Sequence, residues 1–181
     1  KEMITLPSKI WPDFAVTENY RAIFFKVPLE HSYLPGGSGA LPKGAEWFMA
    51  SVINSIITAS STMLFTLVLA FPSAYAFVRF IFRGRDLFLL SLMATRMIPL
   101  YALIVPLYII MDWLELLDTN LGLALAYTAM CIPYAVWLLM GFIATIPVEL
   151  EEAARVDGSS RNQTILKIVL PLSVPGLIST G

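Results

Sequence analysis

The side chains that most often perform catalysis or hold metals are scarce in this sequence. The chain contains one histidine, His31, and one cysteine, Cys131. This argues against a His-rich metal site, a histidine-based catalytic triad, a cysteine-based zinc site and a disulfide scaffold. The sequence lacks the GxxxxGK phosphate-binding loop, and the glycine-rich residues 36–39 are followed by no such lysine. We therefore predict no catalytic residue, no metal site and no cofactor site in this chain.

One charged side chain in an apolar surrounding is the first candidate for a functional residue. Arg96 is the only ionisable group well inside the apolar stretch of residues 87–111. A charge inside a membrane is costly, and it marks either a transport path or a buried partner. The alternative is that the stretch enters the membrane late and that Arg96 reaches back to the interface. Asn54, among small polar residues near the start of another apolar stretch, is a second candidate for the path, although such residues usually allow close helix packing.

The distribution of charge indicates which elements position these residues. Hydrophobic residues make up 57% of the chain and charged residues 14%, whereas roughly a quarter of a soluble domain is charged. Twelve Lys and Arg against 13 Asp and Glu leave no basic excess, which argues against a nucleic-acid-binding protein. Residues 47–78 and 119–148 carry no charge at all, and each run is long enough to cross a bilayer. We predict an all-α membrane protein.

The predicted spans cover about residues 47–78, 87–111 and 120–145, and a last one begins at about residue 172. The first three contain Pro72, Pro99, Pro106 and Pro133, each of which removes a backbone donor and favours a kink. Lipid cannot satisfy the freed carbonyls, so kinked helices pack against protein or a wet cavity. This pattern favours a transport bundle over a simple anchor, although proline is common in membrane helices in general.

The connections between the spans predict their orientation. Arg79, Arg83 and Arg85 follow the first span, whereas the acidic connection at residues 112–120 contains no Lys or Arg. The positive-inside rule places the arginines in the cytoplasm and the acidic connection outside. Residues 1–46 are then an extracytoplasmic segment, and residues 147–171 are cytoplasmic. The chain opens on Lys1 and its last apolar stretch is still running at Gly181, so we expect membrane segments to be missing at both ends.

The cytoplasmic residues 147–171 read as two short helices. Pro147 suits a first helical turn, and the glutamates that follow favour the positive end of that helix. Gly158 is a typical C-cap, and Ser160 with Gln163 has the form of a capping box that starts a second helix.

The first of these helices has two features of its own. Glu151 and Arg155 are four residues apart and are expected to pair. Ala153 and Ala154 give a neighbouring face an almost flat surface. The pattern fits either an elbow in the membrane interface or a docking element for a soluble partner, and the spacing does not separate the two.

The same residues carry a resemblance to a known family. Glu152-Ala153-Ala154, then Gly158, then Ile168 and Leu170-Pro171 occur at the spacing of the EAA motif of ABC importer permease subunits. Over roughly residues 48–181 the chain resembles the carbohydrate subfamily, especially maltose-type and trehalose-type second permeases. The further matching segments are Asn54-Ser55, Ala74-Tyr75-Ala76 with Arg79, Met97-Ile98-Pro99, Pro106-Leu107-Tyr108, Leu117-Asp118-Thr119 and Ile146-Pro147. The resemblance implies the type I ABC importer transmembrane domain, a MetI-like helical bundle, in residues 47–181.

The resemblance also implies a function and a set of partners. The chain would translocate an oligosaccharide or related carbohydrate across a bacterial or archaeal cytoplasmic membrane, and it would not be an enzyme. ABC ATPase subunits would bind ATP and Mg and would couple to the segment 147–171. Further partners would be a second permease, which the carbohydrate type implies to be a different chain, an extracytoplasmic solute-binding protein and membrane lipid. The implied docking core is Glu152, Ala153, Ala154 and Gly158, with Glu151 and Asp157 as supporting contacts.

Two alternatives to a sugar importer stay open at this point. The first is a permease for a non-sugar solute in the same superfamily. The second is an ion-driven secondary transporter, which would need acidic residues inside the membrane. No predicted span contains an Asp or Glu away from its ends, which argues against the second alternative.

Overall fold

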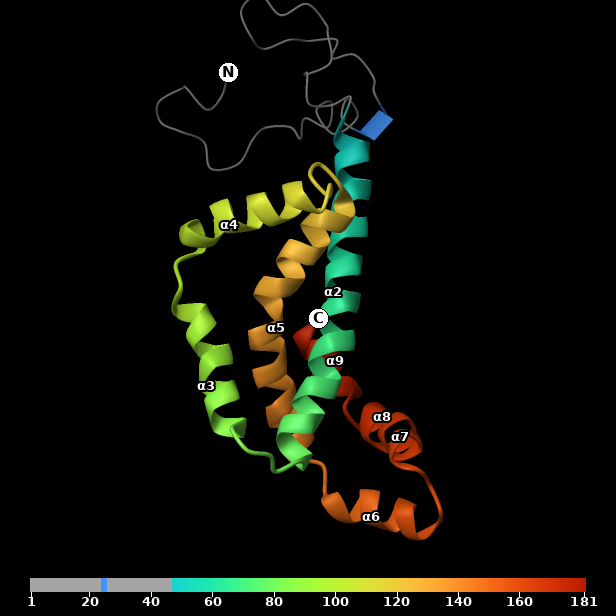
Figure 1. The fold of residues 1–181 in the computed structure, drawn as a ribbon. Coiled ribbons are helices and arrows are strands. Elements are labelled where there is room, and N and C mark those ends of the chain that lie inside the picture. Colours follow the sequence, from blue (N-terminus) through green and yellow to red (C-terminus); the bar gives the residue numbers. More distant parts are fainter. Residues whose placement is uncertain (1–23, 26–46) are drawn as a thin grey trace, which may run out of the picture. The chain divides into compact units, whose positions relative to one another are not determined.

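The computed structural model of the chain describes residues 24–25 and 47–181. Most of the predicted extracytoplasmic segment, with His31 and residues 36–39, lies outside these described residues. The chain divides into two compact units, Lys1–Ile56 and Ile57–Gly181. In the first unit, the rings of Phe24 and Phe48 meet edge to face with 5.5 Å between their centroids. All regular structure in the described part of the chain is helical (Figure 1), which confirms the predicted all-α class.

Two helices are long and apolar enough to cross a membrane. They are α2 (Phe48–Arg79), with Pro72 inside it, and α5 (Asn120–Ala144), with Pro133 inside it. Thr119 caps the start of α5, where its hydroxyl accepts a hydrogen bond from the Gly122 N–H at 3.0 Å. Between α2 and α5, the Thr62 hydroxyl reaches the Ala124 carbonyl at 3.5 Å. This contact supports the packing interpretation of the small polar residues in this part of α2.

The stretch predicted as the second span contains two helices at a sharp angle. They are α3 (Arg85–Ala94), which continues into the 3-10 turn η2 (Thr95–Met97), and α4 (Leu100–Trp113), and the bend between them is 103°. The break has a local cause, because a proline disfavours helical backbone in the residue before it. Ile98, which precedes Pro99, is extended with φ −72° and ψ 124°. The kink predicted at Pro99 is therefore a full break, whereas Pro106 stays inside α4.

The chain beyond α5 folds into shorter pieces. They are α6 (Val148–Val156), α7 (Arg161–Thr164), a π-helical turn η3 (Ile165–Val169), α8 (Leu170–Leu172) and α9 (Val174–Thr180). A bend of 66° separates α9 from the segment before it, and α9 returns along α5 (Figure 1). The return depends on Gly176, because a Cβ there would lie 2.6 Å from the Phe142 ring. If each bent pair is one span, the described residues hold up to four spans.

The apolar core lies where the C-terminal half of α2 meets α5. It also takes in one residue of the α5–α6 connection and one of η3. The buried members are Ala70, Phe71, Ala74, Tyr75, Ala135, Val136, Leu139, Ile143, Ile146 and Val169. Three of these residues are alanine, and such small side chains allow helices to pack closely. The core therefore fixes the end of α2 next to the start of the α6–α7 segment.

Candidate functional site

We call α6, α7 and the turn at residues 157–160 between them the α6–α7 elbow. Its conformation follows directly from its local sequence. Gly158 has φ +86°, a conformation that side-chain-bearing residues disfavour. The Gly158 N–H donates to the Arg155 carbonyl at 3.1 Å, and the Ser159 N–H donates to the Ala154 carbonyl at 2.9 Å, which together form a Schellman motif. Ser160 and Gln163 then form the predicted capping box at the start of α7. Both short helices and the turn between them are confirmed.

The two faces of α6 differ in what they meet. Glu151 and Ala154 are buried, with 4% and 7% of their surfaces exposed. Glu152, Ala153, Asp157 and Gly158 are exposed. The residues predicted as a single docking surface are therefore divided in this chain. One set faces the helical core, and the other remains open to a partner.

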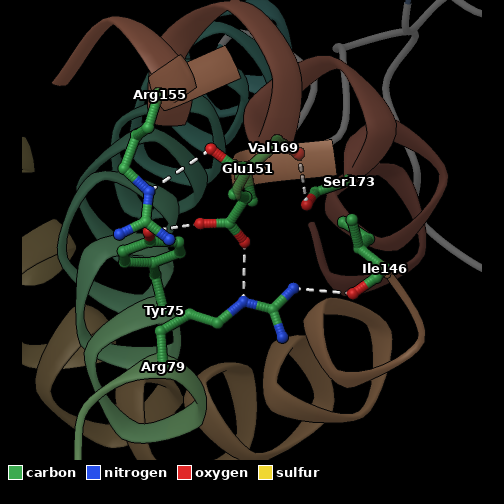
Figure 2. Close-up of polar contacts among 7 residues, drawn as sticks. All are labelled: Tyr75, Arg79, Ile146, Glu151, Arg155, Val169 and Ser173. Atoms are coloured by element: carbon green, nitrogen blue, oxygen red, sulfur yellow. Dashed lines mark hydrogen bonds and ion pairs between the residues drawn. The ribbon is translucent and has the colours of Figure 1, made fainter. Parts of the chain in front are cut away.

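The Glu151 carboxylate is held by α2 (Figure 2). Its Oε2 accepts a hydrogen bond from the Tyr75 hydroxyl at 2.6 Å, and its Oε1 accepts one from Nε of Arg79 at 2.7 Å. The predicted side-chain pairing of Glu151 with Arg155 is wrong. Arg155 Nε instead donates to the backbone carbonyl of Glu151 at 3.4 Å. The reason is burial, because a carboxylate inside the protein needs partners that are buried with it.

Arg79 connects this carboxylate to the connection between α5 and α6. Its Nη2 donates to the Ile146 carbonyl at 2.7 Å, and 14% of its side chain is exposed. Tyr75 is buried with its ring in the apolar core. Tyr75 and Arg79 lie four residues apart, so they share one face of α2. One face of α2 thus supplies a neutral and a charged donor to a single carboxylate.

A small polar cavity of about 140 Å³ lies beside this cluster, lined by residues of α2, α6 and α7 and by Phe80. The Arg161 guanidinium lies over the Phe80 ring, 4.7 Å from its centroid, a geometry that favours a cation–π interaction. This contact attaches α7 to the chain just after α2. Both short helices of the elbow are therefore anchored to the same end of α2.

The two residues predicted for a transport path lie elsewhere. Arg96 is in η2, at the break before α4, where its Nη1 donates to the Met130 carbonyl at 2.9 Å. Its guanidinium is 6.0 Å from the Tyr134 ring centroid. It lines a cavity of about 590 Å³ that Pro99, Leu103 and other mainly apolar residues enclose. Asn54 is exposed in the first turns of α2. Among residues 24–25 and 47–181, no group of His, Cys, Asp or Glu could hold a metal ion.

Sequence reasoning missed the partners of Glu151. Tyr75 and Arg79 are 76 and 72 residues away from it. The sequence connected them only with the family resemblance and, for Arg79, with the orientation of the spans. A usable signal was present, because an arginine at the very end of an apolar helix is close enough to the interior to need an acidic partner. Glu149, Glu151 and Glu152 were candidates, because they lie in the other connection that was predicted to be cytoplasmic.

The chain is similar to known proteins in both sequence and structure. Residues 47–180 match the family model described as binding-protein-dependent transport system inner membrane component. The chain is 37% identical over 137 residues to the diacetylchitobiose uptake system permease protein DasC of Streptomyces coelicolor, covering 76% of this chain and 50% of that protein. It is 32% identical over 173 residues to the trehalose transport system permease protein SugB of Mycobacterium tuberculosis, covering 96% of this chain and 56% of that protein.

A solved structure is also similar. A bacterial ABC transporter involved in the import of the acidic polysaccharide alginate matches with a TM-score of 0.66 and 26% identity. The match covers 81% of this chain and 55% of that chain. The chain thus spans about half the length of the relatives it matches.

Proposed function

Because the chain belongs to the family of binding-protein-dependent transport system inner membrane components, we propose that it is part of the permease subunit of an ATP-driven importer. The membership confirms the resemblance drawn from the EAA motif. Two helices able to cross a membrane, and two further bent pairs, support a multi-pass protein. In the proposed orientation, residues 1–46 are outside and the α6–α7 elbow is in the cytoplasm.

The proposed substrate is an oligosaccharide or a related carbohydrate. Its support is the names of the relatives, which include permeases for diacetylchitobiose, trehalose and galactooligosaccharides. The sulfoquinovosyl glycerol permease SmoH of Agrobacterium fabrum is 31% identical over 99% of this chain. Arg96 and Asn54 are proposed to line the path. A non-sugar solute remains the alternative that uptake assays must test.

The exposed face of α6, continued by Asp157 and Gly158 just after the helix, is the observation that carries the coupling role. Ala153 and Gly158 present little side-chain bulk, and the carboxylates of Glu152 and Asp157 flank them. Such a surface allows a partner's backbone to approach closely and favours a partner with basic side chains. We assign this face to a separate ATPase subunit, which binds ATP and Mg. The remaining partners are a second permease, a solute-binding protein and lipid. Ala154 supports the face from behind rather than contacting the ATPase.

The test measures uptake by the complete transporter in proteoliposomes loaded with ATP. Glu152→Lys and Gly158→Pro are expected to abolish ATP-linked uptake of labelled trehalose or diacetylchitobiose, whichever the wild-type complex transports. The permease itself should remain in the membrane. Asp86→Lys is the matched control, because it makes the same charge change on exposed residues of α3. Normal uptake by both Glu152→Lys and Gly158→Pro would overturn the coupling role.

A second measurement addresses the energy source. A wild-type complex should co-purify with an ATPase subunit and should lose uptake when ATP is withdrawn. Uptake that survives without ATP and stops when the proton gradient is dissipated would instead establish an ion-driven transporter.

A further inference from the structure

We propose that Glu151, Tyr75 and Arg79 form a clasp that transmits movement of α6 to α2, so that these three are positioning residues of the transport cycle. The inference rests on the proposed function, since it assumes that an ATPase subunit moves α6. It differs from that proposal in the face of α6 concerned. The ATPase would meet the exposed face, whereas the clasp lies on the buried face.

The clasp joins three parts of the chain through one carboxylate and one guanidinium. Tyr75 and Arg79 of α2 hold Glu151 of α6 at 2.6 and 2.7 Å, and Arg79 also holds the Ile146 carbonyl at 2.7 Å. Figure 2 shows the Arg79 side chain lying between the Glu151 carboxylate and Ile146. A shift of α6 away from α2 therefore lengthens at least one of the two bonds to Glu151.

Burial makes this connection stiff. Glu151 is 4% exposed and Tyr75 is 5% exposed, so water can reach a broken bond only through the small polar cavity beside the cluster. A buried charge that loses its partner is strongly disfavoured, and hydrogen bonds depend on direction in a way that apolar contacts do not. Apolar contacts in the core are not directional, whereas the directional bonds of the clasp favour one relative position of α2 and α6.

The clasp lies in the part of α2 that a movement of α6 could bend. Pro72 lies three residues before Tyr75 and removes the backbone hydrogen bond to Val68. The Ser73 hydroxyl also bonds to the Leu69 carbonyl at 2.7 Å, a contact that often accompanies bending of helices. The clasp therefore grips the last two turns of α2, beyond the point where this helix bends most easily. The Tyr75 ring carries the same displacement into the core against α5.

The experiment compares three variants of the complete transporter in proteoliposomes. Glu151→Gln keeps the shape of the side chain and removes its charge. Tyr75→Phe removes one hydrogen bond and keeps the ring, so it tests the clasp with little disturbance of folding. Glu149→Gln is the matched control, because it removes a charge from an exposed position on the same helix. Three quantities are measured for each: ATPase subunit retained on the permease, ATP hydrolysed, and labelled trehalose or diacetylchitobiose taken up.

The expected result is a loss of coupling with the complex intact. Glu151→Gln should lower the sugar transported per ATP by roughly tenfold, because loss of the charge weakens both bonds to α2. Tyr75→Phe should lower it by about threefold, because it removes one of these bonds and keeps the ion pair with Arg79. Both should retain the ATPase subunit, and Glu149→Gln should match the wild type. A purely structural role would instead lower the amount of complex and leave the sugar-to-ATP ratio unchanged.

Two results would overturn the clasp. One is a wild-type sugar-to-ATP ratio in Tyr75→Phe and in whatever Glu151→Gln complex assembles. The other is loss of the ATPase subunit from Glu151→Gln in proportion to lost uptake, which would place Glu151 in the docking surface. Failure of the proposed function is distinguishable, because the wild-type complex itself would then show no ATP-driven uptake.

Discussion

Arg79 and Arg96 lie in two regions of the molecule that give a guanidinium opposite surroundings. Arg79, at the end of α2, has 14% of its side chain exposed and pairs with the Glu151 carboxylate at 2.7 Å. Arg96, at the break before α4, is exposed and bonds to a backbone carbonyl. No ion pair to Arg96 occurs within the described residues. One arginine is thus neutralised inside the chain, and the other presents its charge to a cavity.

This difference supports a different proposed role for each region, a mechanical one at α6 and a recognition one at η2. A buried pair whose bonds are all made within the chain fixes the relative positions of two helices, and little of it remains for an outside ligand. A guanidinium on a cavity wall keeps donors that a solute or a neighbouring subunit can use. We therefore propose that the region at α6 transmits force and that the region at η2 contacts the transported solute.

The largest expected effect is that of Arg79→Ala. The substitution leaves the buried Glu151 carboxylate without its charged partner. In comparable pairs this lowers the free energy of unfolding by about 3–5 kcal/mol. The measurement is the free energy of unfolding of the purified complex in detergent. Arg96→Ala is the matched comparison, because the same side chain is removed from an exposed position, and it should cost less than about 1 kcal/mol. Equal losses would mean that burial does not distinguish the two regions.

Gly158→Ala should have an intermediate effect at the elbow. A Cβ at Gly158 meets no atom within 4 Å, so the cost comes from its φ of +86° alone. Left-handed backbone in a non-glycine residue costs roughly 1–2 kcal/mol. Gly141→Ala is the control, because that site in α5 is equally open and is helical. It should stabilise the protein by about 0.5–1 kcal/mol. Opposite signs of the two changes in thermal stability are the result that checks this prediction.

Ser160→Ala should have a smaller effect on the same elbow. It removes the hydroxyl that accepts from the Gln163 N–H at 3.4 Å, and the loss of an N-cap typically costs about 1 kcal/mol. Because α7 has only four residues, the loss should appear as faster hydrogen exchange in α7 and η3. Exchange in α2 and α5 should be unchanged. A uniform increase across all helices would show that the capping box stabilises more than the elbow.

The elbow and the clasp also differ in how far the sequence predicts them. Gly158, Ser160 and Gln163 act on neighbours within a few residues, so their types and spacing were enough to place two short helices. The partners of Glu151 are more than 70 residues away, and the sequence suggested Arg155 because it is close along the chain. Because Glu151 is buried in the folded chain, its carboxylate is held by Tyr75 and Arg79 instead. The break at Pro99 lies between these cases, because proline predicts a disturbance but not its 103° angle.

Arg96→Lys should have the smallest effect on stability, and it tests most directly whether the Arg96 region recognises the solute. Lysine keeps the charge but loses the planar fork that donates to the Met130 carbonyl and faces the Tyr134 ring. We expect a change in stability below about 0.5 kcal/mol, as for other exposed substitutions. If the guanidinium contacts the solute, the KM for uptake should rise several-fold while the sugar transported per ATP stays constant. Glu151→Gln should show the reverse pattern, with a lower ratio and little change in KM. The two variants then separate recognition from coupling, because each changes a quantity that the other leaves alone.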